Sequence, residues 1–341
     1  MKRFLAILHA RNIEFFRDKS ALSWNLILPF FLVFGFAYLF SDEAREIYKV
    51  GLVGESTESY KSKTDFFNLK QIQFIKIADL DKAINKVKHH QLDMLIKNDG
   101  NIHYWINSSS VNGHILERVL KGSELGSRPV LDYQKQTVDG KQVRYVDWVL
   151  PGILAMNIMF SCLFGIGYVI VRYRKNGVLK RLKATPLTAF EFITAQIMSR
   201  LILIVIITAI VFFGSDLFVH FHMIGSYFLL FFVFTLGAFC LISLGLIVAA
   251  KTTSEELANG LLNLISWPMM IFSGVWFSLE GSPDIVIIIA QFMPLTHIID
   301  AARAIMNDGA GITEIYPNLL ALTVMSIAFT TIGSLMFRWE R

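Results

Sequence analysis

Long apolar stretches without charged residues recur along this chain and predict helices that cross a membrane. A helix needs about 20 apolar residues to cross a bilayer, and a charge near its centre costs several kcal/mol. Four stretches meet this requirement directly: residues 21–40, 148–171, 257–279 and 315–337. Another lies within residues 217–250, which carry no charge and whose membrane part we expect to begin after the polar residues 220–222. Residues 201–213 need the preceding residues 192–200 to reach full length, so the sequence predicts six spans.

Residues 41–147, between the first and second spans, follow a different pattern. They hold 16 of the 32 Lys and Arg residues and 15 of the 27 Asp and Glu residues. The segments YKVGLVGES from residue 48 and LDMLIKNDGNIHYWINSS from residue 92 favour strands, with a turn at Asn98–Gly100. DLDKAINKVKHH from residue 79 and NGHILERVL from residue 112 have helical spacing. We therefore expect an α-helical membrane protein with an inserted α+β domain of three or four strands and helices on one face.

Composition agrees with this class and gives no sign of enzyme chemistry. The chain is 54% hydrophobic and 17% charged, with a mean hydropathy of +0.51. It has no G-x-x-x-x-G-K-[ST], H-E-x-x-H or G-x-S-x-G pattern, so we expect no catalytic residue, no metal site and no ATPase site of its own. Cys162 and Cys240 are expected to be packing residues, and Arg200 is expected to extend to the membrane interface. The energy for any transport would then come from another polypeptide.

The basic residues divide unequally between the two ends of the predicted spans. Five lie in residues 1–20, six in residues 172–183, one at Lys251 and two in residues 338–341, which makes 14 on one side. The opposite short connections carry only Arg303. Because short cytoplasmic loops are enriched in Lys and Arg, we expect a multi-pass protein of the inner (plasma) membrane with both termini, including the 338–341 tail, in the cytoplasm. Residues 41–147 would lie outside.

Residues 176–187 form a polar break between the second and third spans. Val178, Leu179 and Leu182 fall on one side of a predicted short helix, while Lys180, Arg181 and Lys183 fall mostly on the other. Thr185–Pro186 suits an N-cap and first-turn position, and Thr188 with Glu191 has the spacing of a capping box. These residues favour either a rigid helix that transmits the movement of a soluble partner, or an ordinary solvated loop followed by a helix cap.

Two stretches resemble a known family. NGVLKRLKATPLTAFEFITAQ, residues 176–196, is similar to the G-[TV]-L-x-x-L-x-x-[TS]-P-L stretch of ABC-2 type transporter permeases, the membrane subunits of a class of ABC exporters. MPLTHIIDAARAIM, residues 293–306, resembles the P-L-[TS]-x-x-x-[DE]-x-x-R-x-[IL] segment before the last span of the same family. Together with six spans and a long insert after the first, the resemblance covers the whole chain.

The resemblance implies an architecture and partners. Residues 1–20 would form an interfacial elbow helix, residues 176–187 a coupling helix that docks on a separate ABC ATPase, and residues 284–307 an outer re-entrant segment containing Pro294, Asp300 and Arg303. Two permease copies, identical or different, would work with two ATPases, which hold the ATP and Mg, so this chain would need no cofactor. It would export a hydrophobic or amphipathic substrate such as a lipid or drug.

The coupling helix would then use its residues in separate roles. Val178, Leu179 and Leu182 are expected to form its apolar contact with the ATPase, and Lys180 and Arg181 its polar contact. The angle between this helix and the third span would be fixed by Pro186, Leu187 and the Thr188–Glu191 cap. The alternative function is a membrane-anchored receptor or surface-interaction protein that binds through the inserted domain.

Overall fold

The computed structural model describes residues 2–40, 48–53, 65–69, 71–88, 92–98, 102–108, 110–124, 144–252, 254–279 and 282–336. The chain divides into two compact units, residues 1–41 with 142–341 and residues 42–141. The first is a bundle of helices and the second contains a small sheet. The expected turn at Asn98–Gly100 extends into residues outside the described ranges, as do the basic residues of the 338–341 tail.

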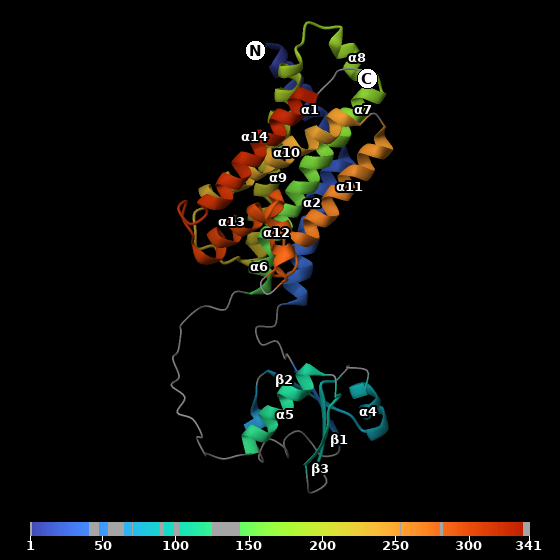
Figure 1. The fold of residues 1–341 in the computed structure, drawn as a ribbon, viewed down its shortest axis with the longest axis vertical. Helices are drawn as coiled ribbons and strands as arrows, with labels where there is room; N and C mark the ends of the chain where they lie inside the picture. Colours follow the sequence, from blue (N-terminus) through green and yellow to red (C-terminus); the bar gives the residue numbers. More distant parts are fainter. Residues whose placement is uncertain are drawn as a thin grey trace. The chain divides into compact units, whose positions relative to one another are not determined.

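The helices of the first unit are drawn in Figure 1. Their bounds are α1 Lys2–Arg17, α2 Lys19–Leu39, α6 Tyr145–Cys162, α7 Val169–Lys175, α8 Val178–Lys183, α9 Ala189–Val219, α10 Tyr227–Lys251, α11 Glu255–Phe272, α12 Asp284–Gln291, α13 Pro294–Asp308 and α14 Tyr316–Met336. A π-helix, η2, Leu163–Tyr168, joins α6 to α7 without a break.

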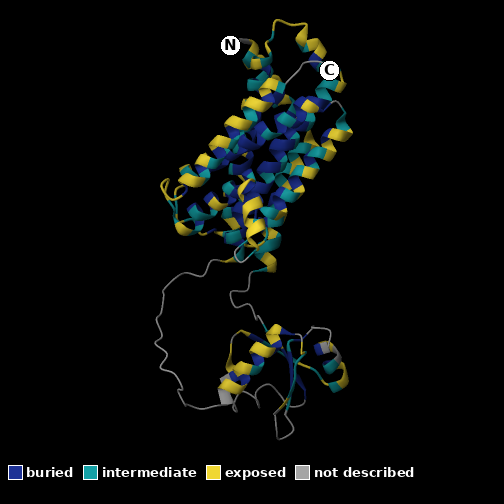
Figure 2. Ribbon diagram, viewed as in Figure 1, coloured by how far each residue is buried: buried dark blue, intermediate teal, exposed yellow. Residues whose placement is uncertain are grey.

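The core of this unit lies around α6 and α10. Most residues of both helices are buried, and α10 packs against α13, α14 and η2. By contrast, few residues of α2 and α14 are buried, and exposed residues follow the outer edges of the bundle in Figure 2. The apolar side chains on these outer helices suit contact with lipid rather than water.

One of the predicted spans is shorter and more polar than the sequence suggested. Among the described residues, five continuous helices are long and apolar enough to cross a membrane: α2, the α6–α7 rod, α9, α10 and α14. A sixth arises only if α12 and α13, which meet at 94°, count together. The predicted span at residues 257–279 is helical only to Phe272, and α11 is not among the five because Glu255, Glu256, Asn259 and Asn263 make it more polar.

Local caps set several helix ends. Ser226 and Ser254 accept hydrogen bonds from backbone N–H groups in the first turns of α10 and α11. The helix α10 begins at Tyr227, beyond residues 220–222, as the sequence predicts. Gly309 ends α13 with a φ of 71°, a conformation that glycine adopts without strain.

The second unit is a four-stranded mixed sheet in the order β2-β1-β3-β4. Its elements are β1 Tyr48–Val53, the short helix η1 Asp65–Asn68, β2 Ile72–Lys76, α4 Leu80–Lys88, β3 Met94–Asn98, β4 Ile102–Trp105 and α5 Val111–Glu124. The strand β1 pairs in parallel with β2 and β3, and β3 pairs antiparallel with β4.

The two helices of this unit cover opposite faces of the sheet, so the expectation of helices on one face is wrong (Figure 1). On one face, Val50 and Leu52 pack with Leu116 and Leu120 of α5. On the other, Val53 packs in a second cluster with residues of α4. Both faces of these short strands are therefore apolar, because a sheet covered on both faces has no strict alternation of apolar and polar positions.

Candidate functional site

The segment between α7 and α9 forms the short helix expected at residues 176–187. Gly177, with a φ of 67°, precedes α8, and glycine permits this left-handed conformation. Leu179 is fully buried, and Leu182 is partly buried against the core of the helical unit. Lys180 and Arg181 are exposed, and neither pairs with a carboxylate among the described residues. The apolar side of α8 therefore holds the helix to its own chain.

This arrangement changes the expected role of Leu179. Its side chain has no exposed surface, so it is not available to a docking partner in this structure. Val178 and Leu187 keep some exposure, whereas Lys183, Pro186 and Thr188 are exposed. The exposed surface of α8 is therefore mainly basic, and of the three apolar residues expected to contact a partner, only Val178 and Leu182 keep some exposure.

The start of α9 has the capping box that the sequence predicts. The Thr188 hydroxyl accepts a hydrogen bond from the backbone N–H of Glu191 at 3.2 Å, and the Glu191 carboxylate accepts one from the backbone N–H of Thr188 at 3.0 Å. Thr185–Pro186 is not the helix start, because α9 begins at Ala189 and the Thr185 hydroxyl donates to the carbonyl of Leu182. Arg3 of α1 donates to the carbonyl of Pro186 at 2.6 Å, which ties α1 to this turn.

The re-entrant residues separate into different environments. Pro294 is buried at the first turn of α13, while Asp300 is exposed. Arg303 is partly buried, and its guanidinium lies 3.6 Å from the centre of the Trp148 ring. It donates to the carbonyls of Trp148 at 3.1 Å, Gly274 at 2.8 Å and Val275 at 3.4 Å. Arg303 therefore joins α13, α6 and the turn after α11, and it forms no ion pair with Asp300.

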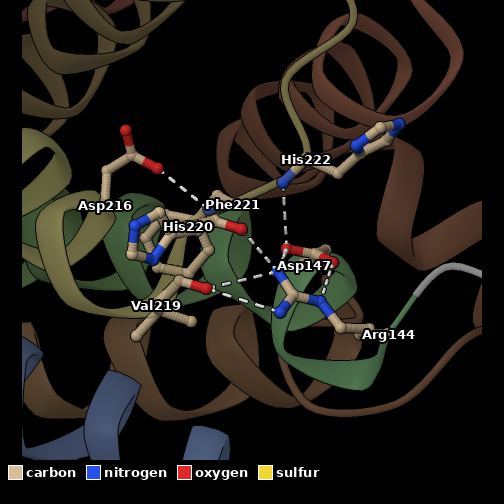
Figure 3. Close-up of polar contacts among 7 residues, drawn as sticks. All are labelled: Arg144, Asp147, Asp216, Val219, His220, Phe221 and His222. Atoms are coloured by element: carbon tan, nitrogen blue, oxygen red, sulfur yellow. Dashed lines mark hydrogen bonds and ion pairs between the residues drawn. The ribbon is translucent and has the colours of Figure 1, made fainter. Parts of the chain in front are cut away.

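A second polar cluster, which the sequence did not indicate, lies at the start of α6 (Figure 3). The Asp147 side chain is buried and accepts two hydrogen bonds from Arg144, at 2.8 and 3.0 Å. Arg144 also donates to the carbonyls of Val219 and His220, at 3.4 and 2.7 Å, and the backbone N–H of His222 donates to Asp147. The cluster ties the beginning of α6 to the turn between α9 and α10.

A cavity of about 940 Å³ opens among α1, α2, the α6–η2–α7 rod and α11. Arg200 of α9 reaches its wall with only 7% of its surface exposed. Its Nε donates to the carbonyl of Ser161 at 2.8 Å, its Nη2 donates to the same oxygen, and its guanidinium lies 5.3 Å from the centre of the Phe15 ring. The expectation that Arg200 extends outward is thus wrong: its side chain points into the bundle.

A second buried arginine, Arg11 of α1, lies on the same wall. It donates to the carbonyl of Gly165 in η2 at 3.1 Å and pairs with Glu14 at 2.9 Å. Glycine at position 165 leaves the room that Arg200 occupies, since a Cβ atom there would collide with the Arg200 guanidinium. Neither arginine could be assigned to the cavity from sequence, because the contacts join segments about 40 to 150 residues apart.

The helical ends near α8 are also joined by polar contacts. Tyr168 donates to Glu255 at 2.5 Å, and Lys175 pairs with the same carboxylate at 3.4 Å. Arg174 donates to the carbonyls of Ala249 and Thr252, at 2.9 and 2.6 Å. The α10–α11 connection is therefore fixed to the segment that leads into α8.

Within the described ranges, no group of three or more His, Cys, Asp or Glu residues has the geometry to hold a metal ion. Cys162 and Cys240 are both fully buried and unpaired. The described side chains assemble a mixed polar and apolar cavity, together with a basic short helix.

Comparisons with known proteins connect these features to transport. The chain is 29% identical over 192 residues to the inner membrane transport permease YhhJ of Escherichia coli, covering 55% of this chain and 51% of YhhJ. It is 20% identical over 248 residues to the probable multidrug ABC transporter permease YbhR of E. coli, covering 68% of this chain and 65% of YbhR. It is 24% identical over 195 residues to the putative transport permease YvfS of Bacillus subtilis, covering 55% of this chain and 76% of YvfS.

The chain spans about half of the length of YhhJ and 65% of that of YbhR. A family model described as ABC-2 family transporter protein matches residues 19–335, from the start of α2 almost to the end of α14. The match therefore includes the helical bundle, the inserted sheet and both motif-bearing segments. This multi-pass membrane protein belongs to the ABC-2 family of transporter proteins.

Proposed function

We propose that this chain is the membrane-spanning permease subunit of an ATP-driven ABC exporter. A separate ABC ATPase would bind and hydrolyse ATP with Mg, while the permease moves a hydrophobic or amphipathic substrate outward as one of a pair of identical or different copies. Family membership and the permeases YhhJ and YbhR support a transport role. The mixed polar and apolar cavity supports an amphipathic rather than a purely polar substrate.

The observation that carries the proposal is the construction of α8. Buried Leu179 and partly buried Leu182 hold α8 to the bundle, while Lys180 and Arg181 project from it. The capping box at Thr188 and Glu191 gives α9 a defined first turn directly after this helix. A partner that moves α8 would move the end of α9 with it, because a packed and capped segment absorbs less motion than a flexible loop.

On this proposal, α8 contacts the ATPase mainly through polar and charged side chains and less through apolar ones. Lys180 and Arg181 would face acidic or polar groups of the ATPase, and Pro186, held by Arg3, would fix the turn. Leu179 would act by keeping α8 in place rather than by touching the partner. This revises the apolar docking contact that the sequence suggested.

Charge reversal at α8 tests the coupling role. In a complex with an ABC ATPase that binds the wild-type chain, Lys180→Glu/Arg181→Glu should weaken association at least about tenfold, as expected for two interface charges worth roughly 1 kcal/mol each. Stimulation of ATP hydrolysis by the permease should fall with it, while insertion and folding stay intact because both side chains are exposed. The matched control is Lys82→Glu/Lys86→Glu on the exposed side of α4. Equal ATPase stimulation by the α8 variant and the control would exclude the coupling role.

We also propose that α8 and both termini lie in the cytoplasm and that residues 41–147 lie outside the inner membrane. The support is the division of short-loop basic residues, 14 against Arg303 alone. Positions 86 and 176 are both exposed, so only the side of the membrane on which each lies decides its labelling. A membrane-impermeant maleimide applied to intact cells should therefore label Lys86→Cys and not Asn176→Cys. The native cysteines are fully buried and should stay unlabelled. Labelling of Asn176→Cys from outside would reverse the orientation.

A further inference from the structure

The charged residues of the cavity lining gather toward the end near α1. On α2 its lining changes from Asp18 and Asn25 to Leu28 and Leu32, away from α1. On α11 it changes in the same direction from Asn259 and Asn263 to Trp267 and Met270. The rod runs the opposite way, with its one charged lining residue, Arg172, near α1 and the uncharged residues Asn157 and Met156 toward the far end. One end of the cavity is therefore polar and charged, and the other is apolar.

The charged end has an excess of positive charge. Arg11 and Arg172 share one carboxylate, that of Glu14, at 2.9 and 3.2 Å. Asp18 is engaged at the first turn of α2, where it accepts a hydrogen bond from the N–H of Ala21 at 3.0 Å. Arg200 has no carboxylate partner among the described residues. Three guanidinium groups thus meet two carboxylates on the cavity wall.

Of the three arginines on the cavity wall, Arg200 is the one whose positive charge no carboxylate among the described residues neutralises. A charge held away from water is costly unless it is paired, and ionisable residues inside membrane helices commonly mark substrate or ion pathways. Arg200 is more than nine-tenths buried, yet two of its nitrogens share one carbonyl oxygen, and its guanidinium lies over the Phe15 ring and against Gly165. A neutral carbonyl and a ring do not cancel its charge. An anion in the cavity would.

We propose that this cavity binds an amphiphile with an acidic headgroup, which Arg200 holds at the polar end while the apolar chain lies between α2 and α11. The inference rests on the proposed permease function and names the substrate class of the same permease. A phosphate or carboxylate matches the planar fork of donors on a guanidinium. A volume of about 940 Å³ and walls of Leu28, Leu32, Trp267 and Met270 accommodate an attached apolar chain, which a free inorganic anion lacks.

Three tryptophans on the cavity wall allow direct measurement of binding. Trp24, Trp267 and Trp276 all line the cavity, so a brominated chain bound there should quench their fluorescence. The probe is 11-bromoundecyl phosphate, added to the purified full-length chain in phosphatidylcholine nanodiscs. The comparison ligand is 11-bromoundecyl glucoside, which has the same chain and no charge. The wild-type protein should bind the phosphate at least about tenfold more tightly, as expected for one charge-assisted pair.

Variants at Arg200 test whether its guanidinium causes the preference for the phosphate over the glucoside. Arg200→Gln should lose the tenfold preference for the phosphate while still binding the glucoside, and Arg200→Lys should keep part of the preference because it keeps the charge. The matched control is Arg118→Gln, an exposed arginine on α5 outside the cavity lining, which should behave as wild type. Thermal unfolding of each variant separates loss of binding from loss of fold. If Arg200→Gln does not fold, the comparison of the two ligands on the wild-type chain still decides the question.

Several outcomes would overturn the inference. Equal affinity of the wild-type chain for the phosphate and the glucoside would show that the cavity does not recognise an acidic headgroup. An unchanged preference for the phosphate in Arg200→Gln would show that Arg200 does not bind the headgroup. Displacement of the bound probe by inorganic phosphate at the same concentrations would indicate a simple anion site instead of an amphiphile site. Because the assay needs no ATPase, failure here leaves coupling at α8 untouched, and failure of coupling leaves this binding result untouched.

Discussion

Arg303 and Arg200 are both partly or fully withdrawn from solvent, and each contacts an aromatic ring and backbone carbonyls, but they use their donors differently. Arg303 distributes its hydrogen bonds over three carbonyls from two segments and stacks on Trp148 at 3.6 Å. Arg200 directs two nitrogens to the single carbonyl of Ser161 and lies on the wall of a cavity. The first arrangement cross-links the fold, whereas the second leaves charge available to a ligand.

The surroundings of Arg303 explain why its role is structural. Gly274 and Val275 lie in the turn after α11, outside helical hydrogen bonding, so their carbonyls need another donor. Close packing places the same turn against α6, where a Cβ atom on Gly152 would approach the Val275 oxygen to 2.7 Å. Arg303 thus satisfies carbonyls at a closely packed junction.

The largest effect on stability is expected for Arg303→Gln. The change removes the charged donor from the carbonyls of Trp148, Gly274 and Val275, and hydrogen bonds to charged groups contribute about 1.5–3 kcal/mol each. Because neighbouring losses do not add fully, the free energy of unfolding of the helical unit should fall by about 2–4 kcal/mol. Chemical unfolding of the full chain in detergent, followed by tryptophan fluorescence, measures it.

The same measurement on Arg200→Gln sharpens the comparison. Here a single carbonyl loses its donor, and removing an uncompensated charge offsets part of the loss, so a fall of about 1 kcal/mol or less is expected. Arg303→Lys serves as a control that keeps charge but loses the planar fork, and it should lie between wild type and Arg303→Gln. Equal destabilisation by the two glutamine variants would mean that Arg200 is as much a structural cross-link as Arg303.

Sequence reasoning succeeded where the signal is local. The capping box at Thr188 and Glu191 is set by residues three positions apart, and the two sides of α8 follow from spacing within one turn. Both family motifs are likewise continuous segments, which is why they indicated the family that the match over residues 19–335 confirms. Patterns of residues close together in the sequence are enough to predict these local features.

Sequence reasoning failed where the outcome depends on packing. Arg200, in the first half of α9, is compatible with extending to the membrane interface, and only the approach of η2 at Gly165 shows that it turns inward. Thr185 and Pro186 suit a helix start, but α9 begins directly after Thr188. Thr188 and Glu191 form both hydrogen bonds of a capping box, which sets the start of the helix there. The two covered faces of the inserted sheet depend on where η1, α4 and α5 pack, which local periodicity does not determine.

An exposed ion pair in the inserted unit provides the smallest effect for comparison with the two arginines. Lys121 donates to the Glu117 carboxylate at 2.6 Å, and the Tyr104 hydroxyl donates to the same oxygen at 2.8 Å. These hydrogen bonds, that of Lys121 first, hold the pKa of Glu117 below its usual 4.5. His114 lies 3.7 Å from the carboxylate. Unlike Arg200 and Arg303, all of these groups can exchange their partners for water.

A lowered pKa in the folded state fixes the sign of the pH dependence. The folded chain holds fewer protons on Glu117 than the unfolded chain does, so its contribution to stability is present above the usual pKa of 4.5 and is lost as pH falls through the folded value. Protection of the α5 amides from hydrogen exchange, corrected for intrinsic rates, should therefore decline below about pH 4.5 in the full-length chain. Glu117→Gln should reduce this decline, and Asp81→Asn on α4 should not. The difference should be small because exposed pairs contribute little. An identical pH profile in wild type and Glu117→Gln would show that this pair adds no stability.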